Sequence, residues 1–230
     1  MIPVVNYVPD FGIPQEASFW MPTEDEIPDD EGLGCFRDVW MILNEPLDDA
    51  RRIVDTETTL IDLADRAALS SEEFEAIARI IETGEIDELS SLPAGARFSV
   101  QEVEMMDWVE SIEPPLGNLE LGVSGLAHAL SAIGAVPVAS CRGHIKGWSD
   151  KPIVYAAVDE PRAQWLQLLV RNSGCGFHIG LNREEFLALE GPSIRHMNRL
   201  AQTILTLFSE GGNVFERWID LDAIDSRYEW

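Results

Sequence analysis

The strongest constraint on the fold is an alternation of helix-like and strand-like segments in the second half of the chain. In some segments the apolar residues fall on one helical face, and in others they form the short continuous runs of buried strands. Helices are expected at 119–134, 159–174 and 193–208, and strands at 136–140, 152–158, 175–181 and 186–189. The order αββ-αββ-α predicts an α+β module with one mixed sheet, in which the middle helix returns a parallel strand.

The first half has helical patterns only. Helices are expected from Asn44, as N-cap with Pro46 inside the first turn, to about Ala68, and from Ser70 or Ser71 to Gly84. A third is expected to start at Ser99, in a capping-box sequence, and to run to the Pro114 break. The chain therefore divides into an extended, acidic, proline-rich arm at 1–43, a helical region at 44–115, the α+β module at 116–210 and an acidic, aromatic tail at 211–230.

The negative charge is concentrated in the N-terminal half. The whole chain has a formal charge of −25, and residues 1–115 hold 28 acidic residues, 6 arginines and no lysine. This half repels phosphate backbones, so direct nucleic-acid binding by it is not expected. The charge suits either solubility alone or a basic protein partner.

The composition indicates a cytoplasmic protein. No run approaches the about 18 apolar residues that a membrane span requires, and the first residues do not resemble a secretion signal. The three cysteines, Cys35, Cys141 and Cys175, are too few and too scattered for a disulfide framework.

The main candidate site follows the strand at 136–140. Ser140 is followed directly by Cys141, Arg142, Gly143 and His144. Gly143 permits a tight turn, and Arg142 is expected to make the neighbouring thiol more acidic or to anchor an anion. Cys141 and His144 are therefore the catalytic candidates, because a thiol can be reactive and an imidazole can act as acid, base or metal ligand near neutral pH.

A second Cys-x-x-His pair, Cys175 and His178, occurs in the expected strand at 175–181. Together the two pairs form a Cys₂His₂ set of the kind that binds zinc. However, residues three apart in a strand point to opposite faces, so the second pair requires a turn. The alternatives are a smaller metal site of Cys141, His144 and one further group, or a buried, apolar role for Cys175.

Three further residues are candidates for ligand binding. Trp148 follows the motif and can stack on a ring, whereas Arg171 and Ser173 end the helix before Cys175. They would join the motif if the strands at 136–140 and 175–181 lie near each other. The alternative for Trp148 is a structural role, in which its side chain anchors the loop after the motif.

The motif carries two resemblances, which cover roughly residues 118–208. The segment 133–144 and the strand after it resemble a set of uncharacterised bacterial and phage proteins with Ser-Cys-x-Gly-His after a helix and a strand. The segment also resembles, more faintly, the wybutosine-synthesis methyltransferase family, which has Ser-Ser-Cys-Ser-Gly-Arg at this place. Here Ala139 and His144 replace the first Ser and the Arg, and residues 171–174 are similar to a second motif of that family. The first resemblance implies a site and a fold, and the second a tRNA-modifying enzyme that uses S-adenosylmethionine.

Two classes of function remain open. The first is a small-molecule or nucleotide-binding α+β protein, with or without enzymatic activity, whose pocket lies at Ser140–His144. The second is an acidic interaction protein that binds a basic partner, such as an immunity or inhibitor protein or a subunit of a phage-defence complex. A concave pocket with converging polar groups distinguishes the first from the second.

Overall fold

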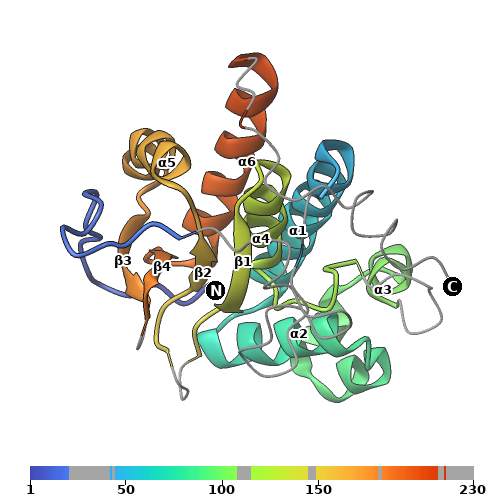
Figure 1. The fold of residues 1–230 in the computed structure, drawn as a ribbon. Helices are drawn as coiled ribbons and strands as arrows, with labels where there is room; N and C mark the ends of the chain where they lie inside the picture. Colours follow the sequence, from blue (N-terminus) through green and yellow to red (C-terminus); the bar gives the residue numbers. More distant parts are fainter. Residues whose placement is uncertain are drawn as a thin grey trace, which may run out of the picture.

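The computed structural model describes residues 1–20, 42, 45–107, 115–144, 149–180, 183–211 and 215, without the side chains of 183–185. Its helices are α1 (Leu47–Ala67), α2 (Ser71–Thr83), α3 (Val100–Met106), α4 (Ser124–Ala132), α5 (Glu160–Ser173) and α6 (Ile194–Gly211), with 3₁₀ turns at Ile86–Ser91 and Pro93–Arg97. Its strands are β1 (Val136–Cys141), β2 (Ile153–Ala157), β3 (Gly176–Gly180) and β4 (Arg183–Glu190). The elements from α4 to α6 confirm the predicted α+β class and order (Figure 1).

The four strands form one sheet in the order β1-β2-β4-β3, and every neighbouring pair is antiparallel. The prediction of a mixed sheet is therefore wrong. The segment β2-α5-β3 does bring β3 back parallel in direction to β2, but β4 folds back and lies between them. As a result β1 and β3 are the two edges of the sheet.

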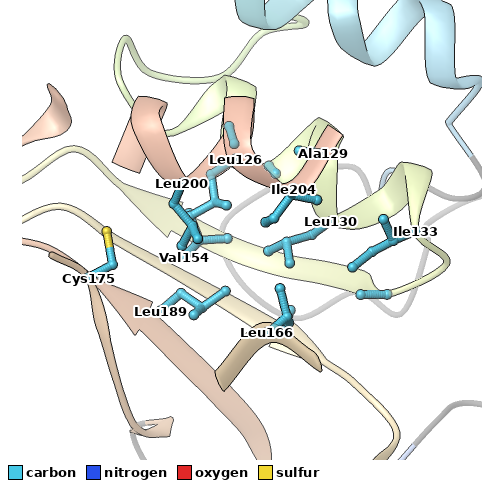
Figure 2. Close-up of a cluster of buried hydrophobic side chains, with 14 of the residues drawn as sticks. Leu126, Ala129, Leu130, Ile133, Val154, Leu166, Cys175, Leu189, Leu200 and Ile204 are labelled. Atoms are coloured by element: carbon cyan, nitrogen blue, oxygen red, sulfur yellow. The ribbon is translucent and has the colours of Figure 1, made fainter. Parts of the chain in front are cut away.

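The largest core cluster lies on the helix-covered face of the sheet. Leu126 and Leu130 of α4, Leu200 of α6 and Val154 of β2 are all essentially buried, and Figure 2 shows these side chains pointing toward one another. A smaller cluster on the opposite face includes Cys141. The sheet therefore places neighbouring residues of a strand in two separate environments.

The helical region packs against the module through α1, which contacts both α4 and α6. Ser70 caps α2 and Gly84 ends it in the left-handed conformation, as predicted. The predicted capping box at Ser99 is also present in α3, which ends at Met106. The predicted continuation of this helix to Pro114 falls on residues 108–114, outside the described part.

Two predicted helix starts differ from the structure. Pro46 is the N-cap of α1 rather than a first-turn residue, and the predicted cap Asn44 is outside the described residues. The helix predicted from Leu119 begins only at Ser124. Gly122 has a φ of +93°, which is incompatible with a right-handed helix and delays its start.

The N-terminal segment, blue in Figure 1, passes beside β3 without forming a helix or strand of its own. The Asp10 carbonyl accepts a hydrogen bond from the Phe177 backbone N–H at 2.7 Å, and the Val5 N–H donates to the Pro192 carbonyl at 2.8 Å. This segment therefore packs on its own chain. In the described part, no helix is long and apolar enough to cross a bilayer.

One buried carboxylate joins α1 to the start of α4. Glu57 is fully buried, and its Oε1 accepts hydrogen bonds from the N–H groups of Gly122 and Gly125 at 2.9 and 3.1 Å. Its Oε2 accepts a third from Asn198 at 3.0 Å. Burial is the main cause that raises the pKa of Glu57, and the hydrogen bonds oppose it.

This raised pKa predicts a pH-dependent stability. Because the folded state binds the Glu57 proton more tightly than the unfolded state does, stability is lost as the pH rises from the ordinary glutamate pKa through the raised one. We expect the free energy of unfolding to fall less with rising pH in Glu57→Gln than in wild type, measured by urea denaturation from pH 4 to pH 8. The matched control Glu104→Gln changes an exposed carboxylate of α3 and should keep the wild-type slope. Parallel curves for wild type and Glu57→Gln would contradict this prediction.

Candidate functional site

The Cys141–His144 motif lies between the sheet and the helical region. Cys141 ends β1, and Arg142, Gly143 and His144 follow in an irregular turn. The motif meets three carboxylates from elsewhere in the chain: Glu75 and Glu82 of α2, and Glu120 before α4. The site is thus assembled from three separate parts of the sequence.

Arg142 is the buried cation of the cluster, with 5 % of its surface exposed. Its Nε lies 2.9 Å from Glu82 Oε1 and its Nη2 lies 3.2 Å from Glu75 Oε1. Its backbone N–H donates to Glu120 Oε2 at 2.7 Å. Burial raises the pKa of Glu82 to about 7, although the Arg142 charge opposes this shift. The guanidinium is therefore engaged by protein carboxylates before any ligand arrives.

His144 lies between two of these carboxylates. Its Nδ1 is 2.6 Å from Glu75 Oε1, and its Nε2 is 3.0 Å from Glu120 Oε1. Its backbone N–H donates to the Ser149 carbonyl at 2.8 Å, which holds the two ends of the loop together. Both ring nitrogens are consequently fixed in direction.

Cys141 differs from its predicted state. The sequence predicts a thiol made acidic by Arg142, but the pKa of Cys141 is raised, and burial is the main cause. The Arg142 guanidinium is directed at Glu75 and Glu82, and its lowering effect on the thiol is smaller than that of burial. Burial therefore disfavours the thiolate form of Cys141.

Gly143 forms the turn with a φ of +80°. A Cβ at this position would lie 2.6 Å from the Lys151 carbonyl carbon and 2.9 Å from its Cα. The motif backbone therefore approaches the start of β2 more closely than any other residue would allow.

Three groups in this cluster can hold a metal ion. Single ligand atoms of Glu120, Cys141 and His144 all lie within 4.8 Å of one another. In the part of the chain that the structure describes, no other group of three such residues meets this criterion. Sulfur, imidazole nitrogen and carboxylate oxygen are all established zinc ligands.

A pocket of about 190 Å³ opens beside the motif. Its polar lining residues are Glu75, Arg142, His144 and Asp150, and its apolar ones are Pro3, Val4, Val5, Phe74, Pro152, Pro192 and Ile194. The N-terminal segment therefore forms one wall, and the motif contributes to another.

The structure does not bring the second Cys-x-x-His pair to this site. Cys175 lies in the helix-side core (Figure 2), with its Sγ 3.8 Å from Met197 Sδ, whereas Cys141 is in the cluster on the opposite face. His178 is on edge strand β3, with its Nδ1 2.7 Å from Glu190 Oε2. The two pairs thus lie on opposite edges of the sheet and do not form a four-ligand group.

The other predicted ligand-binding residues are also dispersed. Ser140 borders a separate small hollow with Leu119, and the Arg171 guanidinium lies 5.4 Å from the centre of the Phe11 ring. Ser173 is buried, and its hydroxyl donates to the Val170 carbonyl at 2.8 Å. Trp148 is outside the described residues.

Sequence reasoning missed the carboxylates of the site. Glu75 and Glu82 are seven residues apart, so they lie two turns apart on one side of α2. They also flank the buried stripe that contains Ile77 and Ile81. Acidic residues beside a buried helical stripe were the available signal for these carboxylates. That pattern does not show that their partner is Arg142.

Comparisons with known proteins provide no assignment. No protein-family model matches the chain, and no curated protein or solved structure matches it significantly. The similarity of the motif to the bacterial and phage proteins and to the methyltransferase family therefore stays a prediction.

Proposed function

We propose that this protein binds a small molecule in the pocket beside Arg142 and His144. The observation that carries the proposal is the convergence of polar groups from α2 and the motif on a pocket of about 190 Å³ with apolar walls. Small-molecule sites typically combine an apolar lining with a few fixed polar groups.

The charges favour a neutral or hydrogen-bond-donating ligand over a nucleotide. Glu75 and Asp150 add two carboxylates to the lining, and Arg142 is already paired with Glu75 and Glu82. A phosphate group would meet these carboxylates without a free guanidinium to bind it. Of the two ligand classes expected from the sequence, the uncharged small molecule therefore fits better.

A variant that fills the pocket tests the proposal. Val5 lines the pocket, and its N–H is anchored to Pro192, so Val5→Trp should reduce the pocket volume without moving the segment. We expect a panel of nucleobases, nucleosides, amino acids and nucleoside monophosphates to contain a neutral member that raises the melting temperature. Calorimetry should show its Kd increased at least about tenfold in Val5→Trp, equivalent to ~1.4 kcal/mol.

The control is Val8→Trp, because Val8 is 85 % exposed and does not line the pocket. This variant should bind the same compound as wild type does. The proposal fails if no panel member stabilises the protein, or if both variants bind equally well. Tighter binding of a monophosphate than of its nucleoside by chelator-treated protein would contradict the charge argument.

An acidic interaction protein is the second candidate. Residues 70–107 carry ten carboxylates and two arginines, and Val100 and Met105 of α3 are exposed among them. This combination favours a basic protein partner whose binding weakens as salt is added. Salt-dependent association in a protein that binds no small molecule would favour this second function.

A further inference from the structure

We propose that Glu120, Cys141 and His144 form a zinc site at the polar end of the pocket. Their ligand atoms already lie within 4.8 Å of one another. Tetrahedral zinc requires ligand atoms about 3.3–3.8 Å apart, given its usual bond lengths of about 2.0–2.3 Å. Small side-chain adjustments therefore suffice to close the site. The site goes beyond ligand binding because it gives the pocket a reactive centre.

The orientation of His144 supports this assignment. Glu75 Oε1 lies 2.6 Å from Nδ1, and a proton on Nδ1 leaves the Nε2 lone pair on the side of Glu120, 3.0 Å away. Metal-binding histidines usually donate their second ring N–H to a carboxylate in this way. Glu75 would thus be a positioning residue that fixes the tautomer of His144.

The charges around the site also favour a divalent cation. Glu75 and Glu82 face the guanidinium of Arg142, and Glu120 accepts a hydrogen bond from the Arg142 backbone N–H. A zinc ion on Nε2 would attract the Glu120 carboxylate and would favour the thiolate form of Cys141.

The backbone is arranged to support a thiolate at Cys141. The Gly143 N–H points toward Cys141 Sγ, at an N-to-S distance of 3.4 Å. Such an N–H donor stabilises sulfur that carries negative charge. The turn at Gly143 therefore brings the Gly143 N–H donor into contact with the first ligand, Cys141. The second ligand, His144, is the residue that directly follows Gly143.

The donor set defines the kind of metal chemistry. One sulfur, one nitrogen and one oxygen ligand suit zinc better than magnesium or calcium, which prefer oxygen alone. Three protein ligands leave a fourth position open, as in catalytic rather than structural zinc sites. Because His144 also lines the pocket, a bound molecule would meet an ion that can polarise a carbonyl group or activate water.

Metal binding tests this site independently of any pocket ligand. Protein stripped with a chelator should take up one equivalent of zinc, measured by competition with a chromogenic chelator. We expect Glu120→Gln, Cys141→Ser and His144→Ala to weaken zinc binding at least about 100-fold, and Glu75→Gln about 10–100-fold. Cys175→Ser and His178→Ala are the matched controls and should bind zinc as wild type does.

Cobalt keeps the test decisive where a variant folds poorly. Cobalt-loaded wild type should show a thiolate-to-metal charge-transfer band, which should persist in Cys175→Ser and disappear in folded Cys141→Ser. No uptake of zinc by wild type would overturn the site, and so would loss of the band in folded Cys175→Ser. Binding of pocket ligands is measured separately by the Val5→Trp comparison. A negative result for zinc would therefore not contradict the proposal that the pocket binds a small molecule.

Discussion

Replacing Arg142 by alanine is expected to destabilise the fold by about 3–5 kcal/mol, because removal of one partner leaves buried charges uncompensated. Arg142 is the cation between Glu75 and Glu82, and its side chain is only 4 % exposed. Its loss would leave the largely buried Glu82 carboxylate without its cation, and would leave Glu75, which also lines the pocket, with His144 as its partner. For a chain of 230 residues, a loss of about 3 kcal/mol corresponds to a melting temperature lower by about 6–12 °C.

The matched control for this prediction is Arg199→Ala. Arg199 is exposed on α6, so its removal should change stability by no more than about 0.5 kcal/mol. Differential scanning calorimetry and urea unfolding measure both variants. An Arg142→Ala protein as stable as Arg199→Ala would show that the cluster is solvated rather than buried.

Replacing Gly143 by alanine is expected to cost about 2–4 kcal/mol, from backbone strain and overpacking combined. The φ of +80° is unfavourable for any residue with a Cβ, and the added atom would lie 2.6–2.9 Å from the Lys151 backbone. Lys151 has little freedom to retreat, because its N–H and its carbonyl both bond to the Ser149 hydroxyl. The same shift would separate Cys141 from His144 and weaken zinc binding.

Gly12→Ala is the control for this second prediction. A Cβ at Gly12 would meet only the Asp10 side chain, at 3.3 Å, and the position has no positive φ. Its unfolding free energy should stay within about 0.5 kcal/mol of wild type. If Gly143→Ala unfolds at the same urea concentration as Gly12→Ala, the close contact with Lys151 does not constrain the motif.

The local elements of the fold could be predicted from the sequence because their signals are local. Asp159 caps α5 through a hydrogen bond to Arg162 N–H, and Gly174 ends this helix in the left-handed conformation. Ser70 and Ser99 do the same for the starts of α2 and α3. Each of these signals acts within four residues, so tertiary structure does not alter it.

The order of strands could not be predicted because it depends on non-local pairing. Apolar runs identify β2 and β3, but no local feature shows that β4 lies between them. For the same reason the sequence left open whether the strands at 136–140 and 175–181 are close, and the structure places them at opposite edges of the sheet. This strand order also separates Cys175 and His178 from the site.

The candidate site was predictable only in its contiguous part. The segment Cys141–His144 brings a thiol, a cation, a turn and an imidazole together within four residues. Its partners Glu75, Glu82 and Glu120 come from 22 to 69 positions away along the chain. Burial, which raises the pKa of Cys141 against the expected effect of Arg142, is likewise a property of the folded chain.

X-ray absorption at the zinc edge of the zinc-loaded protein tests the central claim most directly. The account predicts one sulfur neighbour at about 2.3 Å and nitrogen or oxygen neighbours at about 2.0–2.2 Å, from Cys141, His144, Glu120 and one exchangeable group. Two sulfur neighbours that persist in a Cys35→Ser variant would place Cys175 in the site and contradict the observed sheet. A shell without sulfur would contradict the role of Cys141.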